Sequence, residues 1–516
     1  MYRGKDKGLK IMSKADRIRR AHAEEIARLQ QKKKKTQTPG WVYGLIAGVI
    51  GAVATAVIVI LALQVSGVTL RNTVSVVGTG DDDRMEIDNA VMCYYYMTNY
   101  SQYVNSYGSY LSYLGLDTSD SLKTQEYYGG DGKTWFEYFA DQTKTQVKEL
   151  VITAMAAEKA GFSAEDKVNA YIDSAIENIQ GYAKKNGYSL KKYITLCYGT
   201  GVSESDLREA LKLYYTAQAF YDHLNESYNY TDAEIDAYFA ENAKDYQYFN
   251  LLSYTFKAEY ESSATTKEKE TALAEAKKTA EGLLACKTPE EYKAWVKKYL
   301  QDQDKSDSDI ETALEDLVSE DLLYNENYGY SKWIYEDGRK LNDATLIVDE
   351  DGYTCTVYMV TKLPARYEYN TVNVHHILFS KDVYGSDDKA KAKAEEVLAA
   401  FKTDATVANF EKLAKEFTED TGSVLVGGAY ENVTKDYMVD EFDAWIFAEN
   451  RVAGDCEIVK TSYGYHIIYF DGVSDPAWKA AVISSMKSDD YSEAYEGFEK
   501  IFTVEFDDRK LSKLPF

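Results

Sequence analysis

One uncharged segment divides this chain of 516 residues into two parts of opposite charge. Residues 41–65 contain no Asp, Glu, Lys or Arg, whereas residues 1–40 carry a net charge of +9 and the residues after 65 carry −34. As a helix, the stretch from Trp41 to Leu63 would extend roughly 34 Å, which is enough to cross a bilayer. Trp41 and Tyr43 lie where interfacial aromatic residues are common. We therefore predict a transmembrane helix over residues 41–65.

The charge on either side of this segment predicts its orientation. Basic residues flank the cytoplasmic end of a membrane helix, so residues 1–40 are expected in the cytoplasm and the acidic body outside it. A cleaved signal peptide is the rival interpretation. It fits less well because the apolar run is long, forty residues precede it, and no A-x-A-like site or lipobox cysteine follows, the first cysteine being Cys93. We expect a single-pass protein of the cell membrane with an extracytoplasmic body.

Small residues recur every fourth position along the predicted membrane helix. Such a stripe lets two helices pack closely and would allow a homodimer. The alternative, that Gly and Ala are simply common in single-pass helices, stays open. The stripe consists of Gly44, Gly48, Ala52 and Ala56.

Composition excludes several classes of protein. A hydrophobic content of 45 % excludes a wholly disordered chain, and 28 % charged residues exclude a polytopic membrane protein. Five cysteines, an odd number, cannot form a complete disulfide framework. For so acidic a body we expect no nucleic-acid partner.

The exported part is predicted to begin with a polar linker, residues 66–84, followed by a helical domain over residues 85–245. Eight tyrosines lie between Tyr94 and Tyr113. Tyrosine offers apolar area and a hydroxyl on a side chain with few rotors, so a tyrosine-rich surface can bind many sequences. The alternative is that these rings pack helix against helix.

Residues 246–363 and 366–475 are predicted to be two copies of one module. Trp333-Ile334 and Trp445-Ile446 are 112 residues apart, as are Gly352-Tyr353 and Gly464-Tyr465. Residues 249–256 (FNLLSYTF) align with residues 372–379 (VNVHHILF) at an offset of 123. On this alignment His376 matches Ser253, and His466 matches Thr354. The copies therefore differ where chemistry would lie.

Two histidines of the second copy are predicted to meet. His375 and His376 are adjacent in an extended run, so their side chains point to opposite faces of a sheet. If the first and last strands of the copy are neighbours, His376 can reach His466 across them. Further ligands at metal spacing are missing, so we expect no metal and interpret the pair as part of a hydrogen-bonded network. Met438 and Phe442, four residues apart, share a helix face and could form an apolar cup.

Residues 370–472 resemble the parvulin-type peptidyl-prolyl isomerase domain. The resemblance rests on HHILF at 375–379, Glu-Asp-Thr at 419–421, Gly-Gly at 427–428, Met438, Phe442, and the run from Thr461 to Ile468. It implies four-stranded antiparallel sheets surrounded by helices. The whole layout is similar to PrsA- and SurA-type foldases, which implies a helical chaperone part and a C-terminal helix, here within residues 476–516, that returns to it. We predict an α+β chain with one membrane helix, a helical chaperone domain and two parvulin-like modules, the first degenerate.

The resemblance also implies roles for individual residues. His376 and His466 would be the paired histidines beneath the substrate, and Thr461 the hydroxyl in their network. Either Asp420 or Thr421 would lie near the twisting amide. The proline pocket would be lined by Met438, Phe442 and Tyr430.

The segment Ala429-Tyr430-Glu431 departs from the family, which usually has Asp-Leu-Gly after the paired glycines. No cofactor is implied.

These features predict a membrane-anchored extracytoplasmic foldase that isomerises X–Pro bonds in exported polypeptides and chaperones them. A second hypothesis is a non-catalytic holdase or assembly scaffold that uses the parvulin fold as a peptide-binding surface, which the altered 429–431 segment favours. A third, an acidic cell-wall-binding or adhesive ectodomain, fits the tyrosine content but leaves the histidine pair unexplained.

Overall fold

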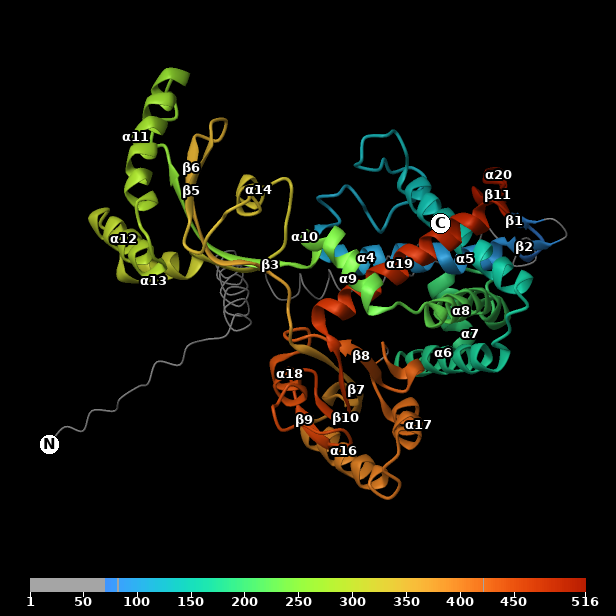
Figure 1. The fold of residues 1–516 in the computed structure, drawn as a ribbon. Coiled ribbons are helices and arrows are strands. Elements are labelled where there is room, and N and C mark those ends of the chain that lie inside the picture. The colour runs from blue at the N-terminus through green and yellow to red at the C-terminus, as the bar shows by residue number, and fades with distance from the viewer. Residues whose placement is uncertain (1–69, 81–82, 421) are drawn as a thin grey trace. The chain divides into compact units, whose positions relative to one another are not determined.

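The computed structural model describes residues 70–80, 83–420 and 422–516 (Figure 1). They form two compact units, one made of the described residues up to 229 together with 487–516, the other of residues 230–486. Within these ranges, no helix combines the length and the apolar composition needed to cross a membrane. The predicted membrane segment 41–65 with its small-residue stripe, the basic segment 1–40, and Thr421 lie outside the described residues.

The first unit is built on five helices, and local side-chain capping explains where four of them begin. Asp88 accepts hydrogen bonds from the N–H groups of Ala90 and Val91, and Thr134 forms a capping box with Glu137. The largest fully buried side chain is that of Trp135. The helices are α4 (Asn89–Tyr107), α5 (Trp135–Lys159), α6 (Glu165–Lys185), α7 (Leu190–Tyr198) and α8 (Glu204–Ser227). A short 3-10 turn, Gly108–Tyr110, follows α4.

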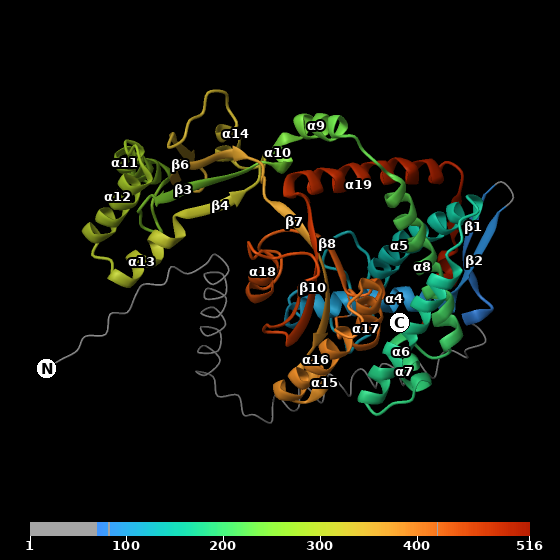
Figure 2. The same ribbon diagram turned by 60° about the horizontal axis from the view of Figure 1, so that its bottom comes forward.

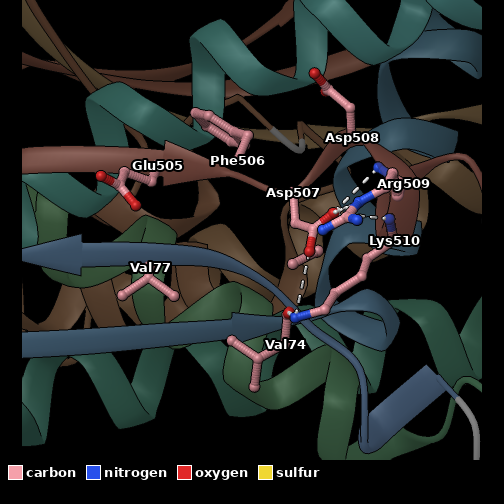
Figure 3. A pocket seen from close by; sticks show the side chains of 9 residues that line it. Val74, Val77, Glu505, Phe506, Asp507, Asp508, Arg509 and Lys510 are labelled. Carbon is pink, nitrogen blue, oxygen red and sulfur yellow. Dashed lines mark hydrogen bonds and ion pairs between the residues drawn. The ribbon is translucent and has the colours of Figure 1, made fainter.

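A three-stranded antiparallel sheet in this unit joins residues from the two ends of the described chain. Its strands are β1 (Val74–Thr79), β2 (Arg84–Asp88) and β11 (Thr503–Phe506), in the order β11-β1-β2. The predicted linker therefore contributes a strand. Beside it, α20 (Asp508–Leu511) begins at Asp507, and Lys510 Nζ donates to the carbonyl of Val74 at 2.8 Å, beside a hollow shown in Figure 3. The C-terminal segment is thus fixed to the start of the unit.

The eight tyrosines of residues 94–113 divide between packing and exposure. Tyr95 and Tyr96 are buried in the core of the first unit. Tyr107, Tyr110 and Tyr113, at the end of α4 and beyond it, are exposed. Packing inside the unit is therefore confirmed for Tyr95 and Tyr96, and binding of polypeptides by the exposed tyrosines stays a prediction.

The second unit contains two four-stranded antiparallel sheets. In Figure 2, helices α11 to α13 gather on one side of strands β3, β4 and β6, where their apolar side chains form one core with the sheet. The first sheet has the order β4-β3-β6-β5. Its elements, after α9 (Asp232–Glu241) and α10 (Ala243–Tyr246), are β3 (Tyr248–Lys257), α11 (Thr266–Leu284), α12 (Pro289–Asp302), α13 (Asp307–Asp316), β4 (Val318–Leu322), α14 (Gly329–Ile334), β5 (Ala344–Asp349) and β6 (Thr354–Ala365).

The second sheet repeats this arrangement with the order β8-β7-β10-β9. Its first and last long strands, β7 and β10, are hydrogen-bonded neighbours. The elements are β7 (Asn370–Phe379), α15 (Lys381–Tyr384), α16 (Asp387–Phe401), α17 (Val407–Phe417), the 3-10 turn η2 (Val424–Val426), β8 (Ala429–Val433), α18 (Asp440–Ile446), β9 (Cys456–Lys460) and β10 (Tyr465–Pro476). Helix α19 (Ala477–Glu499) continues from β10 and crosses from the second unit into the first.

A cluster of three side chains recurs in both modules and supports a duplication. Arg339 Nε donates to the carbonyl of Trp333 and its guanidinium lies over that indole, while the same group forms an ion pair with Asp343. In the second module, 112 residues later, Arg451 makes the same contacts with Trp445 and Asp455.

The strand register corrects one part of the sequence alignment. The N–H of Val360 donates to Asp343, and the N–H of Phe470 donates to Asp455, so the last strands correspond at an offset of 110 rather than 112. Thr356, which pairs with Thr255 as His466 pairs with Leu378, is thus the counterpart of His466. Matching His466 to Thr354 was wrong by two residues because the β5–β6 hairpin of the first module is longer than the β9–β10 hairpin by one residue pair, Asp349 with Thr354.

Candidate active site

The alternation of side chains along β7 brings two buried histidines together. His376 pairs in register with Ile468, and His466 pairs with Leu378, so the two rings lie diagonally across neighbouring strands. Their Nδ1 atoms are 3.1 Å apart. The residues are 4 % and 6 % exposed, so each ring nitrogen depends on a protein partner.

A row of hydrogen bonds continues from each end of this pair. His376 Nε2 lies 2.9 Å from Asp420 Oδ2, and His466 Nε2 lies 2.9 Å from Thr461 Oγ1. Ionised Asp420 can only accept, so His376 Nε2 carries the donated hydrogen. When the His376 ring is neutral, its Nδ1 accepts from His466 Nδ1–H, and His466 Nε2 accepts from the Thr461 hydroxyl. All donors then point toward Asp420.

Asp420 is the end of the network and receives three further donors, one of which is the N–H of Gly422, 3.2 Å from Oδ1. Ser423 Oγ and Tyr430 Oη both donate to Asp420 Oδ2, the latter at 3.0 Å. Ser423 also lies 3.1 Å from His376 Nε2. One carboxylate oxygen therefore organises three side chains from β7, the 420–428 loop and β8.

The surroundings of the network keep one of its members neutral and another ionised. Burial, helped by the neighbouring His376, lowers the pKa of His466 to about 3, so this ring is neutral at physiological pH. The hydrogen bond from His376 is the largest effect holding the pKa of Asp420 below its usual range, and the bonds from Ser423 and Tyr430 act in the same direction. Burial, followed by the charge of Asp420, raises the pKa of Tyr430. The site thus holds a fixed negative charge beside a neutral histidine.

Apolar side chains cover one side of the histidine pair. The ring of Phe442 lies edge-on to both imidazoles, at centroid distances of 5.7 Å from His376 and 5.5 Å from His466. The expected helix face shared with Met438 is wrong, because α18 begins at Asp440 and Met438 precedes it. Met438 is partly exposed and still packs against the apolar cluster that contains Phe442. A buried aromatic ring and a flexible thioether side by side are suited to an apolar ligand.

Two glycines let the backbone approach the histidine strand closely. Gly428 has φ +83°, and a Cβ added there would lie 2.2 Å from the carbonyl oxygen of His376. Its own carbonyl accepts from the N–H of His376 at 2.8 Å. Gly464, with φ +147°, would place a Cβ 2.3 Å from the carbonyl of Phe379. Both positions therefore require glycine to bring their loops to the site.

The structure gathers most of the residues predicted for the site and adds one. Tyr430, predicted as a wall of the pocket, lies with its ring 5.1 Å from that of His376 and its hydroxyl on Asp420. Thr421 lies outside the described residues. Ser423, 1 % exposed, was missed. Its spacing of three residues after Asp420, which suits a local side-chain hydrogen bond, was the available signal.

His375 lies on the opposite face of β7. Its Nδ1 is 2.7 Å from Asp471 Oδ2, and its ring contacts Phe410 in the other core of the module. The expected division of the two adjacent histidines between sheet faces is confirmed.

Comparisons with known proteins point to one family. Residues 358–473 match the model of the PPIC-type PPIase domain. The foldase protein PrsA of Staphylococcus epidermidis is 26 % identical over 236 residues, covering 42 % of this chain and 71 % of that protein. The foldase protein PrsA of Staphylococcus aureus is 31 % identical over 144 residues, covering 26 % of this chain and 43 % of that one.

The crystal structure of PrsA from Bacillus subtilis is 19 % identical, covers 58 % of this chain and 88 % of that chain, and has a TM-score of 0.19. From the family match and the sequence relatives, the chain carries a parvulin-type peptidyl-prolyl isomerase domain and is related to PrsA foldases.

Proposed function

We propose that this PrsA-like parvulin isomerase is a membrane-anchored extracytoplasmic foldase, which isomerises X–Pro bonds in exported polypeptides and holds those clients while they fold. The observation that carries the proposal is the hydrogen-bonded pair of His376 and His466, linked to Asp420 and covered by Phe442, within the domain that matches the isomerase family.

The reaction requires no bond to break. Rotation about an X–Pro bond faces a barrier of about 18–20 kcal/mol because the amide is conjugated. A 10³-fold acceleration requires about 4 kcal/mol of stabilisation that the twisted amide receives and the planar amide does not. A site can supply this by binding the ring and by disfavouring conjugation.

We assign these two tasks to different parts of the site. Met438 and Phe442 would hold the proline ring, with Tyr430 at the edge. Asp420 would lie near the prolyl amide, where its negative charge opposes the partial negative charge that conjugation places on the amide oxygen. The planar amide is thereby destabilised relative to the twisted one.

The remaining residues of the network would keep this charge in place. Neutral His466, oriented by Thr461, would fix the ring of His376, which in turn holds Asp420. These positioning residues add little to the affinity for the substrate. They fix the position of the Asp420 carboxylate, on which its electrostatic effect on the amide depends.

The membrane anchor and the extracytoplasmic location rest on residues 1–65. An uncharged segment long enough to span a bilayer follows a segment of net charge +9. Exported clients arrive unfolded, and proline isomerisation takes 10–100 s unaided, so an isomerase held at the membrane would act where the need arises.

A second candidate is a non-catalytic holdase that uses the parvulin fold as a peptide-binding surface. The Tyr430 hydroxyl, in the segment that departs from the family, occupies Asp420 Oδ2 together with two other donors. A carboxylate so fully engaged would have less capacity to act on a substrate.

Isomerisation by the full chain in lipid nanodiscs distinguishes these candidates. We expect wild-type protein to accelerate cis/trans exchange of a short X–Pro peptide, measured by exchange NMR, and His466→Ala to abolish this. His375→Ala, on the other face of β7, is the control and should retain the activity. Equal exchange rates with and without wild-type protein would refute the isomerase proposal, and suppression of client aggregation without exchange would establish the holdase.

A further inference from the structure

The first unit contains a groove that the isomerase site does not use. Residues of α4, α6 and α7 line it, and it has a volume of about 720 Å³. Tyr182, Tyr193 and Tyr198 line it from α6 and α7, with Met97 and Ile179 adding apolar area. This volume suits part of an extended peptide or a ligand of similar size.

The α4 wall of the groove is polar but uncharged. Ser101, Gln102, Asn105 and Ser106 line the groove and are exposed. Within the described part of the chain, none of these four side chains has a hydrogen-bond partner. Amide and hydroxyl groups can pair with the N–H and C=O groups of any peptide main chain, so this wall suits a polypeptide of variable sequence.

The charge around the groove is opposite to that of the rest of the body. Residues 89–116 contain no charged residue, and residues 178–203 contain four lysines and no Asp or Glu. The four lysines, here called the basic rim, are all exposed, and none lies in an ion pair within the described residues. In the sequence, two of them follow Tyr182 at the end of α6 and two precede Tyr193 at the start of α7. The basic rim consists of Lys184, Lys185, Lys191 and Lys192.

We propose that this groove binds an extended client segment in which apolar or aromatic side chains are flanked by Asp or Glu. The main chain pairs with the amide and hydroxyl groups of α4, the apolar side chains lie against the three tyrosines, and the acidic side chains approach the basic rim. This deepens the proposed function, on which it rests, by assigning the first unit a client class. Elsewhere the acidic body repels such segments, so the groove supplies the affinity that the net charge opposes.

A lipid surface is a less suitable occupant. A surface that inserts into a bilayer presents apolar side chains outward, with basic residues around them. Here the tyrosines line a concave groove, and the wall opposite them consists of hydrogen-bonding side chains.

The test uses the full chain in phosphatidylcholine nanodiscs and two fluorescent peptides. Both lack proline and share a core of tyrosine and leucine, which is flanked by aspartates in one and by lysines in the other. We expect fluorescence anisotropy to give at least tenfold tighter binding of the aspartate-flanked peptide. We expect the preference to weaken several-fold from 50 to 500 mM salt.

Variants locate the binding. Replacing the four lysines of the basic rim by Gln should abolish the preference, and replacing them by Arg should retain it. A control set of four equally exposed lysines in the first parvulin-like module, changed to Gln, should have no effect. A photo-crosslinking version of the peptide should label α4, α6 or α7. The control set is Lys267, Lys293, Lys297 and Lys298.

Several outcomes would overturn the proposal: no binding of either peptide, equal affinity for both, a preference unchanged by the Lys→Gln variant, or displacement of the peptide by phosphatidylglycerol vesicles. X–Pro exchange is measured on the same samples. Isomerase activity without the peptide preference refutes only the proposal that the groove binds such segments. The preference without isomerase activity refutes only the catalytic part of the proposed function.

Discussion

Asp420 and Asp471 offer a matched test of the proposed catalytic charge. Each carboxylate lies beside a histidine of β7, at 2.9 Å from His376 and 2.7 Å from His375 respectively. Their side chains are 22 % and 21 % exposed. Because His375 and His376 are adjacent, the two pairs lie on opposite faces of one strand. The substitutions Asp420→Asn and Asp471→Asn therefore remove the same charge in similar surroundings.

The expected cost in stability is moderate for both variants. A hydrogen bond to a charged group contributes about 1.5–3 kcal/mol and a neutral one about 1 kcal/mol. Asparagine keeps the shape and one accepting oxygen. In Asp420→Asn the three bonds to Oδ2 weaken without being lost, whereas the bond from the N–H of Gly422 to Oδ1 is lost. Partial exposure reduces the difference further. We expect a loss of about 1–2 kcal/mol for Asp420→Asn, whose carboxylate receives four donors, and about 1 kcal/mol for Asp471→Asn, so both should remain folded.

The effect on activity should differ sharply. If the charge of Asp420 disfavours the planar amide, Asp420→Asn should lower kcat/KM for an X–Pro peptide by about 10- to 100-fold, equivalent to roughly 1.4–2.7 kcal/mol. Asp471→Asn should stay within about twofold of wild type, a difference below roughly 0.5 kcal/mol. Urea unfolding of the same samples controls for stability. Equal activity losses in the two variants, or full activity of Asp420→Asn, would refute the assigned role.

Three further predictions concern stability. The pKa of His466 is about 3 in the folded protein against 6.5 in the unfolded chain, so the unfolded chain binds a proton first as the pH falls. The free energy of unfolding should therefore fall by up to about 1.4 kcal/mol per pH unit between pH 6.5 and 3. In His466→Gln the urea midpoint should fall less steeply over the same range. Burial raises the pKa of Asp443 to about 6, so ionisation of this residue lowers the free energy of unfolding as pH rises from 3.8 through 6. Asp443→Asn should therefore stabilise the protein by about 1 kcal/mol above pH 6 and have no effect at pH 3. Gly428→Ala, which meets the His376 carbonyl, should cost about 2–4 kcal/mol in thermal unfolding, against about 1 kcal/mol for Gly454→Ala, where φ is also positive but the space is open.

The histidine pair was predictable because strand alternation depends on the local sequence. Adjacent histidines in an extended run must divide between two faces, and β10 brings His466 to one of them. The contacts of Ser423 and Tyr430 were not predictable in the same way. They depend on the path of residues 420–430, where Gly427 takes a left-handed conformation and Gly428 passes close to His376. Backbone torsions at such positions follow from tertiary contacts rather than from residue spacing.

The misalignment of the two modules has a related cause. Gly-Tyr occurs at the end of both hairpins, 112 residues apart, and this coincidence concealed a difference of one residue pair in hairpin length. A shift of two residues keeps every side chain on the same face of a strand, so hydrophobic patterning does not detect it. The strand pairing reveals it, as do the hydrogen bonds from Val360 to Asp343 and from Phe470 to Asp455.

The corrected register bears on why the histidines are present at all. The first module has the same strand order and the same Trp–Arg–Asp cluster, yet it has Ser253 and Thr356 in place of His376 and His466. The frame therefore does not need the histidine pair in order to fold. Burying two imidazoles, and lowering the pKa of one of them to about 3, costs stability that the first module avoids. A costly network that the fold does not require is best explained by the chemistry it performs, which favours an active isomerase over a holdase that merely keeps the parvulin shape.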